Sequence, residues 1–305
     1  MPVIFSGVCG FFWLGDRTRR WWPYLASGLL AGLSVWTHPT GRLIPFVIAL
    51  YVIYRLTVGR GRTAEGAPAK EQPRSLLLGT VLWGVAAFVV FLPLGLEFLR
   101  HPDFFFGHAS EVSVFGQPGP GASVAGALLR HTLDVLGMFN IAGDWAWIHN
   151  LAGRPVFDPL MSVAFLLGLG VWVWRLLRRD DEDRAALALL AAWSLVMLLP
   201  SIFSDAPPNF SRTLPSLPAI FVAAGLGLDT LVGLRLPRLH RSAAVGPALA
   251  AVIVVVSGGL AFRDYFLVFP AQSQAYYAYD QDKGDALAVL NQMVPGNQVY
   301  LSQLW

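Results

Sequence analysis

Long apolar runs alternate with short polar connectors along most of this chain. A helix needs about 20 apolar residues to cross a bilayer, and most of the runs come close to that length. The pattern therefore predicts an all-α polytopic membrane protein with about seven or eight transmembrane helices within residues 1–262. The runs lie at residues 1–14, 21–37, 41–57, 76–96, 157–174, 185–203, 214–232 and 243–262.

Lysine and arginine gather in every second connector. The basic connectors are 16–20, 55–74, 175–184 and 235–241. Basic loops stay in the cytoplasm, so this alternation predicts that the remaining connectors lie outside. These are 38–40, 97–156, 204–213 and everything after 262. We expect a multi-pass protein of the plasma membrane with an extracytoplasmic C-terminus.

Composition agrees with this assignment. Hydrophobic residues make up 55% of the 305-residue chain and charged residues only 13%, with a mean hydropathy of +0.55. Soluble domains carry about a quarter charged residues, so the bilayer is the expected surroundings. The net charge of +3 reflects loop residues that set topology, and no nucleic-acid partner is expected. The single Cys9 excludes an intrachain disulfide.

Two segments depart from the pattern of spans. The external segment 97–156 is too long for a bare link, and its stretch 122–142 suits an amphipathic helix on the membrane surface. From residue 263 to 305 the pattern changes to a helix near 285–290, a turn and a strand at 298–302. This pattern is typical of the beginning of an extracytoplasmic α/β domain. One helix and one strand cannot bury a core, so a truncated domain is expected.

The hairpin tip between the second and third runs is the first candidate for a site. His38 precedes Pro39, which disfavours helix at His38, and Thr40 is placed to cap the next helix. Arg42 lies in the first turn of that helix, where free N–H groups attract phosphate. The tip therefore suits phosphate binding, although an equal alternative is that Arg42 snorkels to lipid headgroups while His38 only caps the turn. Gly28 and Gly32 form a small-xxx-small pair that allows close helix packing.

Two further outer segments carry candidate residues. Arg212 follows a proline-rich stretch at the mouth of a span, where it is either a second phosphate or sugar contact or an interfacial anchor. His101, Asp103 and His108 occupy a loop that we interpret as a substrate-binding segment. Their loose spacing is a weak signal for a divalent metal, and no metal or other cofactor is assigned.

Several stretches resemble a known family. GLLAGLSVWTHPTGRLIPFVIAL is similar to a hairpin of membrane glycosyltransferases of the GT-C class, the bacterial protein-mannosyltransferase-like and aminoarabinose-transferase-like enzymes of the family 39 type. HPDFFFGHASEVSVF resembles their external loop. Further similarity covers nearly the whole chain in order, through NLAGRPVFDPLMSVAFLLGLG, APPNFSRTLPSLPAIFVAAGLGLD and DYFLVFP.

The resemblance implies an enzyme that moves a sugar from a polyprenyl-phosphate donor to a glycan, lipid or protein acceptor on the extracytoplasmic face. His38 matches the position of a basic residue that contacts the donor phosphate, with Arg42 beside it and Arg212 as a further contact. The family's catalytic carboxylate lies in the first external loop, and no acidic residue precedes Asp16 here. The catalytic residue is therefore unknown, neither Asp103 nor Asp144 is assigned to it, and a fragment lacking N-terminal spans is expected.

Two other functions compete with this interpretation. A transporter or flippase for a lipid-linked substrate would need polar residues along its spans, which are nearly free of them. A non-catalytic membrane partner would need no site at all. The concentration of histidines, acids and arginines on one predicted face favours the enzyme.

Overall fold

The computed structural model of the protein describes residues 1–58, 72–105, 107, 113–115, 123–178, 183–234 and 242–292. Within these ranges the chain is helical and contains no β-strand, the nearest approach being an isolated antiparallel bridge between Ser113 and Ser204. The expected strand at 298–302 lies outside the described residues. The helix expected near 285–290 is present as α13, which spans Gln281–Leu290.

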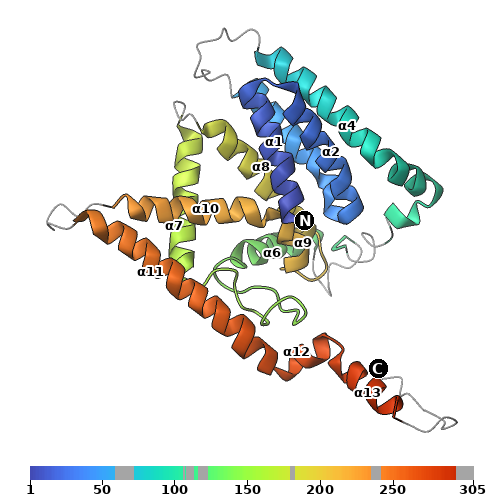
Figure 1. Cartoon of the computed structure of the whole chain (residues 1–305), viewed down its shortest axis with the longest axis vertical. Coiled ribbons are helices and arrows are strands. Elements are labelled where there is room, and N and C mark those ends of the chain that lie inside the picture. Colours follow the sequence, from blue (N-terminus) through green and yellow to red (C-terminus); the bar gives the residue numbers. More distant parts are fainter. Residues whose placement is uncertain are drawn as a thin grey trace.

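The helices fall into two groups along the chain (Figure 1). The first comprises α1 (Pro2–Thr18), α2 (Trp21–Thr37), the 3-10 turn η1 (Pro39–Leu43), α3 (Ile44–Thr57) and α4 (Gln72–Arg100). The second comprises α7 (Pro159–Leu177), α8 (Arg184–Ile202), α10 (Leu217–Val232) and α11 (Ser242–Phe262). Shorter elements complete the chain: α6 (Val124–Gly137), α9 (Phe210–Thr213), η2 (Leu214–Ser216), the π-helical η3 (Arg263–Val268), η4 (Phe269–Ala271) and α12 (Ser273–Ala278).

Six helical segments are long and apolar enough to cross a bilayer: Pro39–Thr57, Arg74–Arg100, Pro159–Leu177, Arg184–Ile202, Phe210–Val232 and Ala244–Ala271. α1 and α2 have 17 residues each and account for the difference from the predicted seven or eight spans. The chain thus has the all-α architecture of a multi-pass membrane protein.

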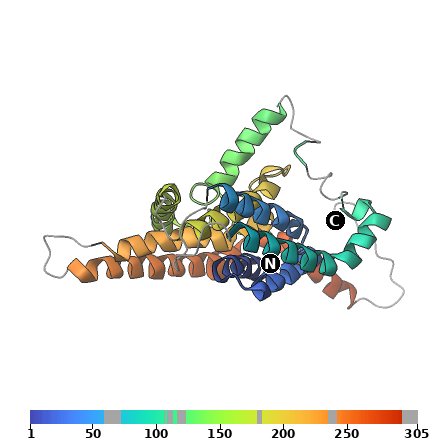
Figure 2. The same cartoon turned by 90° about the horizontal axis from the view of Figure 1, so that it is seen from above.

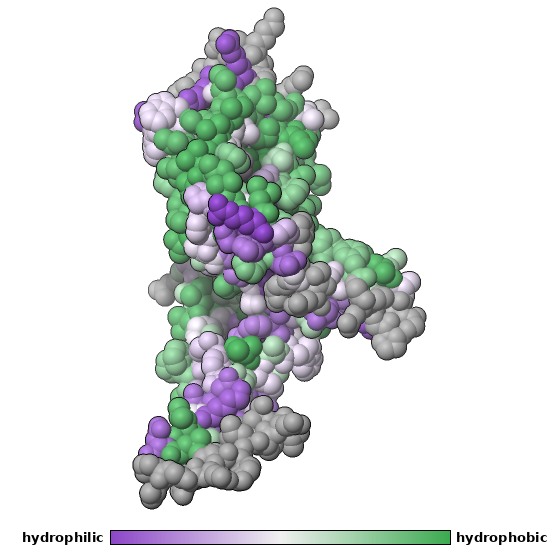
Figure 3. All heavy atoms as spheres, turned by 90° about the vertical axis from the view of Figure 1, so that its right-hand side faces the viewer, coloured by the Kyte–Doolittle hydropathy of each residue, from purple (hydrophilic) through white to green (hydrophobic). Residues whose placement is uncertain are grey.

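The lipid-facing surface is clearest on α4. Only 22% of its most apolar stretch is buried inside the protein. Figure 3 shows the corresponding face as a broad green surface over the upper part of the molecule. Apolar side chains that are exposed to this degree indicate contact with lipid. They are Leu77, Leu78, Val81, Val85, Phe88, Val89, Leu92, Leu96 and Leu99.

Small residues let the helices approach closely in both groups. A Cβ on Gly28 would lie 2.4 Å from the Trp83 carbonyl oxygen, and one on Gly32 would lie 2.6 Å from that of Ala87. The predicted close packing of Gly28 and Gly32 is confirmed, and their partner is α4. In the second group α7 crosses α10 in the same way, because a Cβ on Gly168 would lie 1.7 Å from the Ala223 carbonyl oxygen.

Aromatic packing fixes the centre of the first group. The buried ring of Phe12 meets the rings of Tyr24, Tyr51 and Trp83 edge-to-face, with centroids 5.2, 5.9 and 6.1 Å away. Edge-to-face contacts of this kind place the positive ring edge against the negative face of the neighbouring ring. Four helices, α1 to α4, are thereby joined around one side chain.

The basic ends of several helices meet at one end of the molecule. Asp16 at the end of α1 accepts hydrogen bonds from the Tyr51 hydroxyl at 2.6 Å and the Arg55 Nε at 2.7 Å. The guanidinium of Arg184, at the start of α8, lies 5.9 Å from the ring centre of Tyr54. α6 and α9 both contact α8, and the 3-10 turn η2 that follows α9 contacts α1. The side of the membrane on which these ends lie stays a prediction, and the basic connector 235–241 lies outside the described residues.

Candidate functional site

The hairpin tip folds around His38. Pro39 forces the preceding residue out of the helical region, and His38 is extended with φ −166° and ψ 143°. Its Nδ1 accepts the backbone N–H of Thr40 at 3.2 Å and lies 2.8 Å from the Thr40 Oγ1. The prediction that Thr40 caps the following helix is therefore wrong. Thr40 is buried inside η1, and His38 is the capping residue.

This cap decides what His38 can offer to a ligand. Because Nδ1 accepts an N–H, the imidazole proton sits on Nε2. Partial burial lowers the pKa of His38 below its ordinary value, since it penalises the charged form. At neutral pH the side chain is a neutral hydrogen-bond donor, so any positive charge at the tip comes from Arg42.

Arg42 is held between the hairpin and the end of α4. Its Nη1 donates to the Phe105 carbonyl oxygen at 2.7 Å. The guanidinium lies over two aromatic rings, 4.1 Å from the centre of Phe105 and 4.9 Å from that of Phe98. Cation–π contacts with these two rings stabilise the positive charge of the guanidinium and restrict its orientation. The Nε of Arg42 is buried and has no hydrogen-bond partner in the part of the chain that the structure describes.

Arg212 belongs to a second cluster, next to the end of α8. Its Nη1 donates to the Ser204 hydroxyl and lies 3.7 Å from the Asp205 carboxylate. The side chain is 21% exposed, and that of Asp205 is 47% exposed. η1 and α9 both contact α8, so the hairpin tip and the helix that carries Arg212 pack against the same helix. Within the described ranges, Arg42 and Arg212 share no hydrogen-bond partner: Arg42 binds Phe105, and Arg212 binds Ser204.

Asp144, to which the sequence assigned no role, joins two segments of the chain. It is only 3% exposed and accepts three hydrogen bonds. The donors are the backbone N–H of Ala146 at 2.8 Å, the His149 Nδ1 at 2.7 Å and the backbone N–H of Phe210 at 2.7 Å. The carboxylate thus joins the segment between α6 and α7 to the start of α9. A pairing across 66 positions leaves no periodic signal in the sequence.

The predicted substrate loop lies beyond the end of α4. The Nε2 of His101 is 3.5 Å from the Glu97 carboxylate, and Asp103 is exposed to solvent. His108 lies outside the described residues. Among those described, no group of three histidine, cysteine or acidic side chains is arranged to hold a metal ion. This loop reaches the hairpin tip through the carbonyl group of Phe105.

Comparison with known proteins yields no relatives: no family model, no curated protein and no solved structure matches this chain.

Proposed function

We propose that this chain belongs to a membrane glycosyltransferase, which takes a sugar from a polyprenyl-phosphate donor and passes it to a glycan, lipid or protein acceptor on the extracytoplasmic face. The observation that carries the proposal is the Nε of Arg42, which is buried and has no acceptor among the described residues. A buried N–H without an acceptor is destabilising by about 1–3 kcal/mol, so a ligand oxygen at this position is favourable. A phosphate oxygen supplies the acceptor and neutralises the charge.

The position of Arg42 favours a phosphate that is attached to a lipid. It lies at the start of the candidate span Pro39–Thr57, where hydrocarbon meets the polar interface. A polyprenyl phosphate has the matching shape, with an anionic head at the interface and a long apolar tail in lipid. Exposed leucines and valines along α4 offer that tail a continuous surface. His38 can add a hydrogen bond from Nε2, and Arg212 a further cation from the neighbouring cluster.

These residues have a defined task in sugar transfer. An acceptor hydroxyl attacks the anomeric carbon, the bond to the carrier phosphate breaks, and a base takes the hydroxyl proton. Negative charge accumulates on the departing phosphate, where Arg42 and His38 stabilise it. The base is not assigned. Asp144 is unsuited to the task because its carboxylate is buried and already accepts three hydrogen bonds.

Binding of radiolabelled polyprenyl phosphate to the purified chain in nanodiscs tests the phosphate site. Arg42→Gln should weaken binding about tenfold or more, because the charge-assisted hydrogen bonds are lost. Arg42→Lys should recover only part of it, since an ammonium group cannot form the same fork. Arg100→Gln is the matched control, because Arg100 is 73% exposed at the end of α4. Equal binding by the wild type and Arg42→Gln would refute the proposal.

A second assay separates transfer from transport. The chain is reconstituted with a polyprenyl-phosphate-linked sugar, and both the transfer of the sugar and the movement of the lipid across the bilayer are measured. Sugar transfer would show that the base lies within these residues. Movement of the lipid without transfer would favour the flippase alternative.

A further inference from the structure

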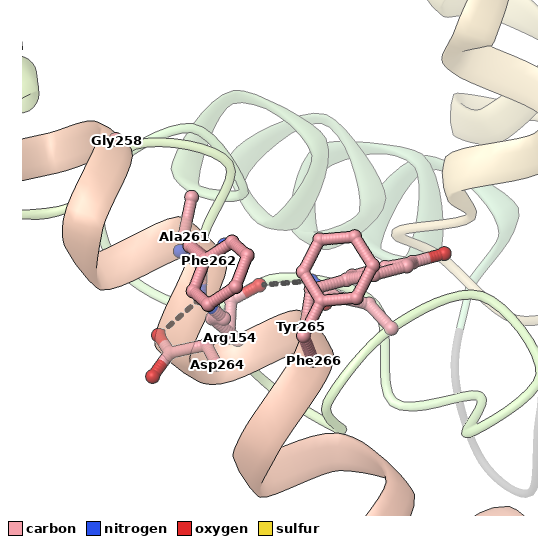
Figure 4. Close-up of a pocket in the computed structure, with 8 residues that line it drawn as sticks. Arg154, Gly258, Ala261, Phe262, Asp264, Tyr265 and Phe266 are labelled. Carbon is pink, nitrogen blue, oxygen red and sulfur yellow. Dashed lines mark hydrogen bonds and ion pairs between the residues drawn. The ribbon is translucent and has the colours of Figure 1, made fainter.

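A hollow of about 430 Å³ lies far along the chain from the hairpin tip, beside the end of α11. Figure 4 shows Arg154 reaching into it from the loop before α7. The opposite wall comes from α11 and η3 and includes Gly258, Phe262 and Phe266. π-helical turns such as η3 are rare and often occur at functional sites.

The charged lining residues of this hollow are Arg154 and Asp264, and Arg263 beside the hollow adds a positive surplus. Asp264 pairs with two arginines: the Arg154 Nε lies 2.8 Å from one carboxylate oxygen, and the Arg263 Nη2 lies 2.7 Å from the other. One carboxylate against two guanidinium groups leaves one positive charge. Both oxygens of Asp264 are occupied, whereas the two terminal nitrogens of Arg154 have no partner among the described residues.

The backbone holds Arg154 in place. Gly153 adopts a φ of 74°, a left-handed conformation that favours glycine. Its N–H donates to the Asp144 carbonyl oxygen at 2.8 Å, and its own carbonyl accepts the Gly143 N–H at 3.0 Å. The Asn150 Nδ2 also donates to the Arg154 carbonyl oxygen, at 3.3 Å. Arg154 therefore extends from a fixed loop, and its guanidinium is oriented by the hydrogen bond from Nε to Asp264.

Apart from Asn150 and Tyr265, the rest of the lining is apolar, and the hollow is open to the surroundings of the protein. Phe262 and Phe266 are 58% and 62% exposed, and their ring centres lie 4.9 Å apart. Gly258 adds no side chain, and no described atom outside its own helix lies within 4 Å of the position a Cβ would take there. Gly258, Phe262 and Phe266 belong to the candidate span Ala244–Ala271. The apolar wall thus faces lipid, and the charged groups lie near the end of the span.

We propose that this hollow binds the phosphate headgroup of an anionic phospholipid from the surrounding bilayer. The terminal nitrogens of Arg154 fork onto the phosphate, and an acyl chain lies along Phe262 and Phe266. Charge complementarity selects the occupant, because a surplus cation beside exposed aromatic rings matches an anionic head joined to an apolar tail. The site uses none of the residues of the hairpin tip, and it does not depend on glycosyl transfer.

Native mass spectrometry of the purified full chain tests this site. The protein is incubated with phosphatidylglycerol or with phosphatidylcholine, and the bound lipid is counted after activation. The wild type should retain phosphatidylglycerol preferentially. Arg154→Lys keeps a cation for Asp264 but removes the fork, and it should lower that preference about fivefold or more without changing the melting temperature. Arg130→Gln, at an exposed position on α6, is the control and should bind like the wild type.

A second arm separates a lipid from free phosphate. Inorganic phosphate alone should leave the melting temperature of the wild type unchanged, whereas phosphatidylglycerol should raise it. Phe262→Ser should weaken lipid retention, since the apolar wall is interrupted. Equal retention of both lipids by the wild type, unchanged retention in Arg154→Lys, or equal stabilisation by inorganic phosphate would each overturn the proposal.

Discussion

Polar side chains at the predicted outer end of the helices form hydrogen bonds with backbone groups, both nearby and distant in the sequence. His38 accepts the Thr40 N–H, Arg42 donates to the Phe105 carbonyl, and Asp144 accepts the Phe210 N–H. Buried backbone groups must be paired, and turns without regular structure leave many of them to side chains. A ligand can then use only the atoms that remain. At the hairpin tip these include the Nε2 of His38 and the Nε of Arg42.

The cap formed by His38 should make the hairpin sensitive to acid. Burial lowers its pKa in the folded state below the ordinary value of about 6.5, so folding favours the neutral imidazole. The stability this contributes is complete above about pH 6.5 and is lost as the pH falls through the lower folded-state pKa. Melting temperatures measured between neutral pH and about pH 5 should show this loss.

His38→Asn is the matched variant for this measurement. Asparagine caps helices well through its side-chain oxygen and does not titrate. The wild type should lose stability relative to His38→Asn as the pH is lowered, and the two should run parallel above neutral pH. Parallel curves over the whole range would show that protonation of His38 does not affect folding.

At the scale of helices, the crossing of α7 and α10 depends on two glycines. A Cβ on Gly168 would lie 1.7 Å from the Ala223 carbonyl oxygen, and one on Gly227 would lie 1.8 Å from that of Ala164. Gly168→Ala or Gly227→Ala should therefore force the helices apart and destabilise the protein by about 2 kcal/mol or more, as overpacking does. Thermal unfolding in detergent measures the effect.

The same two helices provide the controls. At Gly170 on α7 and Gly225 on α10, no described atom outside the helix itself lies within 4 Å of the position a Cβ would take. Gly170→Ala and Gly225→Ala should leave stability unchanged or raise it slightly, because alanine favours helix more than glycine does. If all four variants have the same unfolding temperature, Gly168 and Gly227 are not required for the close approach of α7 and α10.

The elements show which features could be predicted from the sequence. Apolar runs predicted the long helices, because burial in lipid requires continuous hydrophobicity. The Gly28 and Gly32 pair predicted close packing, yet its partner α4 could not be named, because small residues do not specify what they touch. The assignment of the cap to Thr40 failed because a histidine in the N-cap position is not among the usual capping residues. Asp144 joins two loops, and loops carry no periodicity.

At the scale of the whole molecule, the two groups of helices meet where α3 contacts α8. Figure 2 shows α10 and α11 side by side and α6 projecting away from the other helices. On α6, Leu129, Leu133 and Leu136 are 65%, 61% and 53% exposed, and they follow a helical spacing. His131 on its other side is buried and contacts the Ile202 carbonyl. The predicted amphipathic character of this stretch is thus realised, with one face anchored to α8.

The basic connectors predict how the whole molecule is oriented in the membrane. Cys9 is 6% exposed, so the wild type should react little with a membrane-impermeant maleimide and gives a low background. Arg20→Cys and Arg178→Cys place exposed thiols at the basic ends of the helices, and Arg130→Cys and Gln274→Cys place them at the other ends. In intact cells only the second pair should be labelled, because basic connectors stay in the cytoplasm.

Permeabilising the membrane should then make Arg20→Cys and Arg178→Cys reactive, which shows that their thiols are exposed and were only shielded by the bilayer. Labelling of the first pair alone in intact cells would invert the orientation, and the hairpin tip with His38 and Arg42 would then face the cytoplasm. Polyprenyl-phosphate sugars used outside the cell would be unreachable from there. The glycosyltransferase proposal therefore depends on this orientation. The lipid site at Arg154 needs only a membrane interface with anionic headgroups, so the inverted orientation would not contradict it.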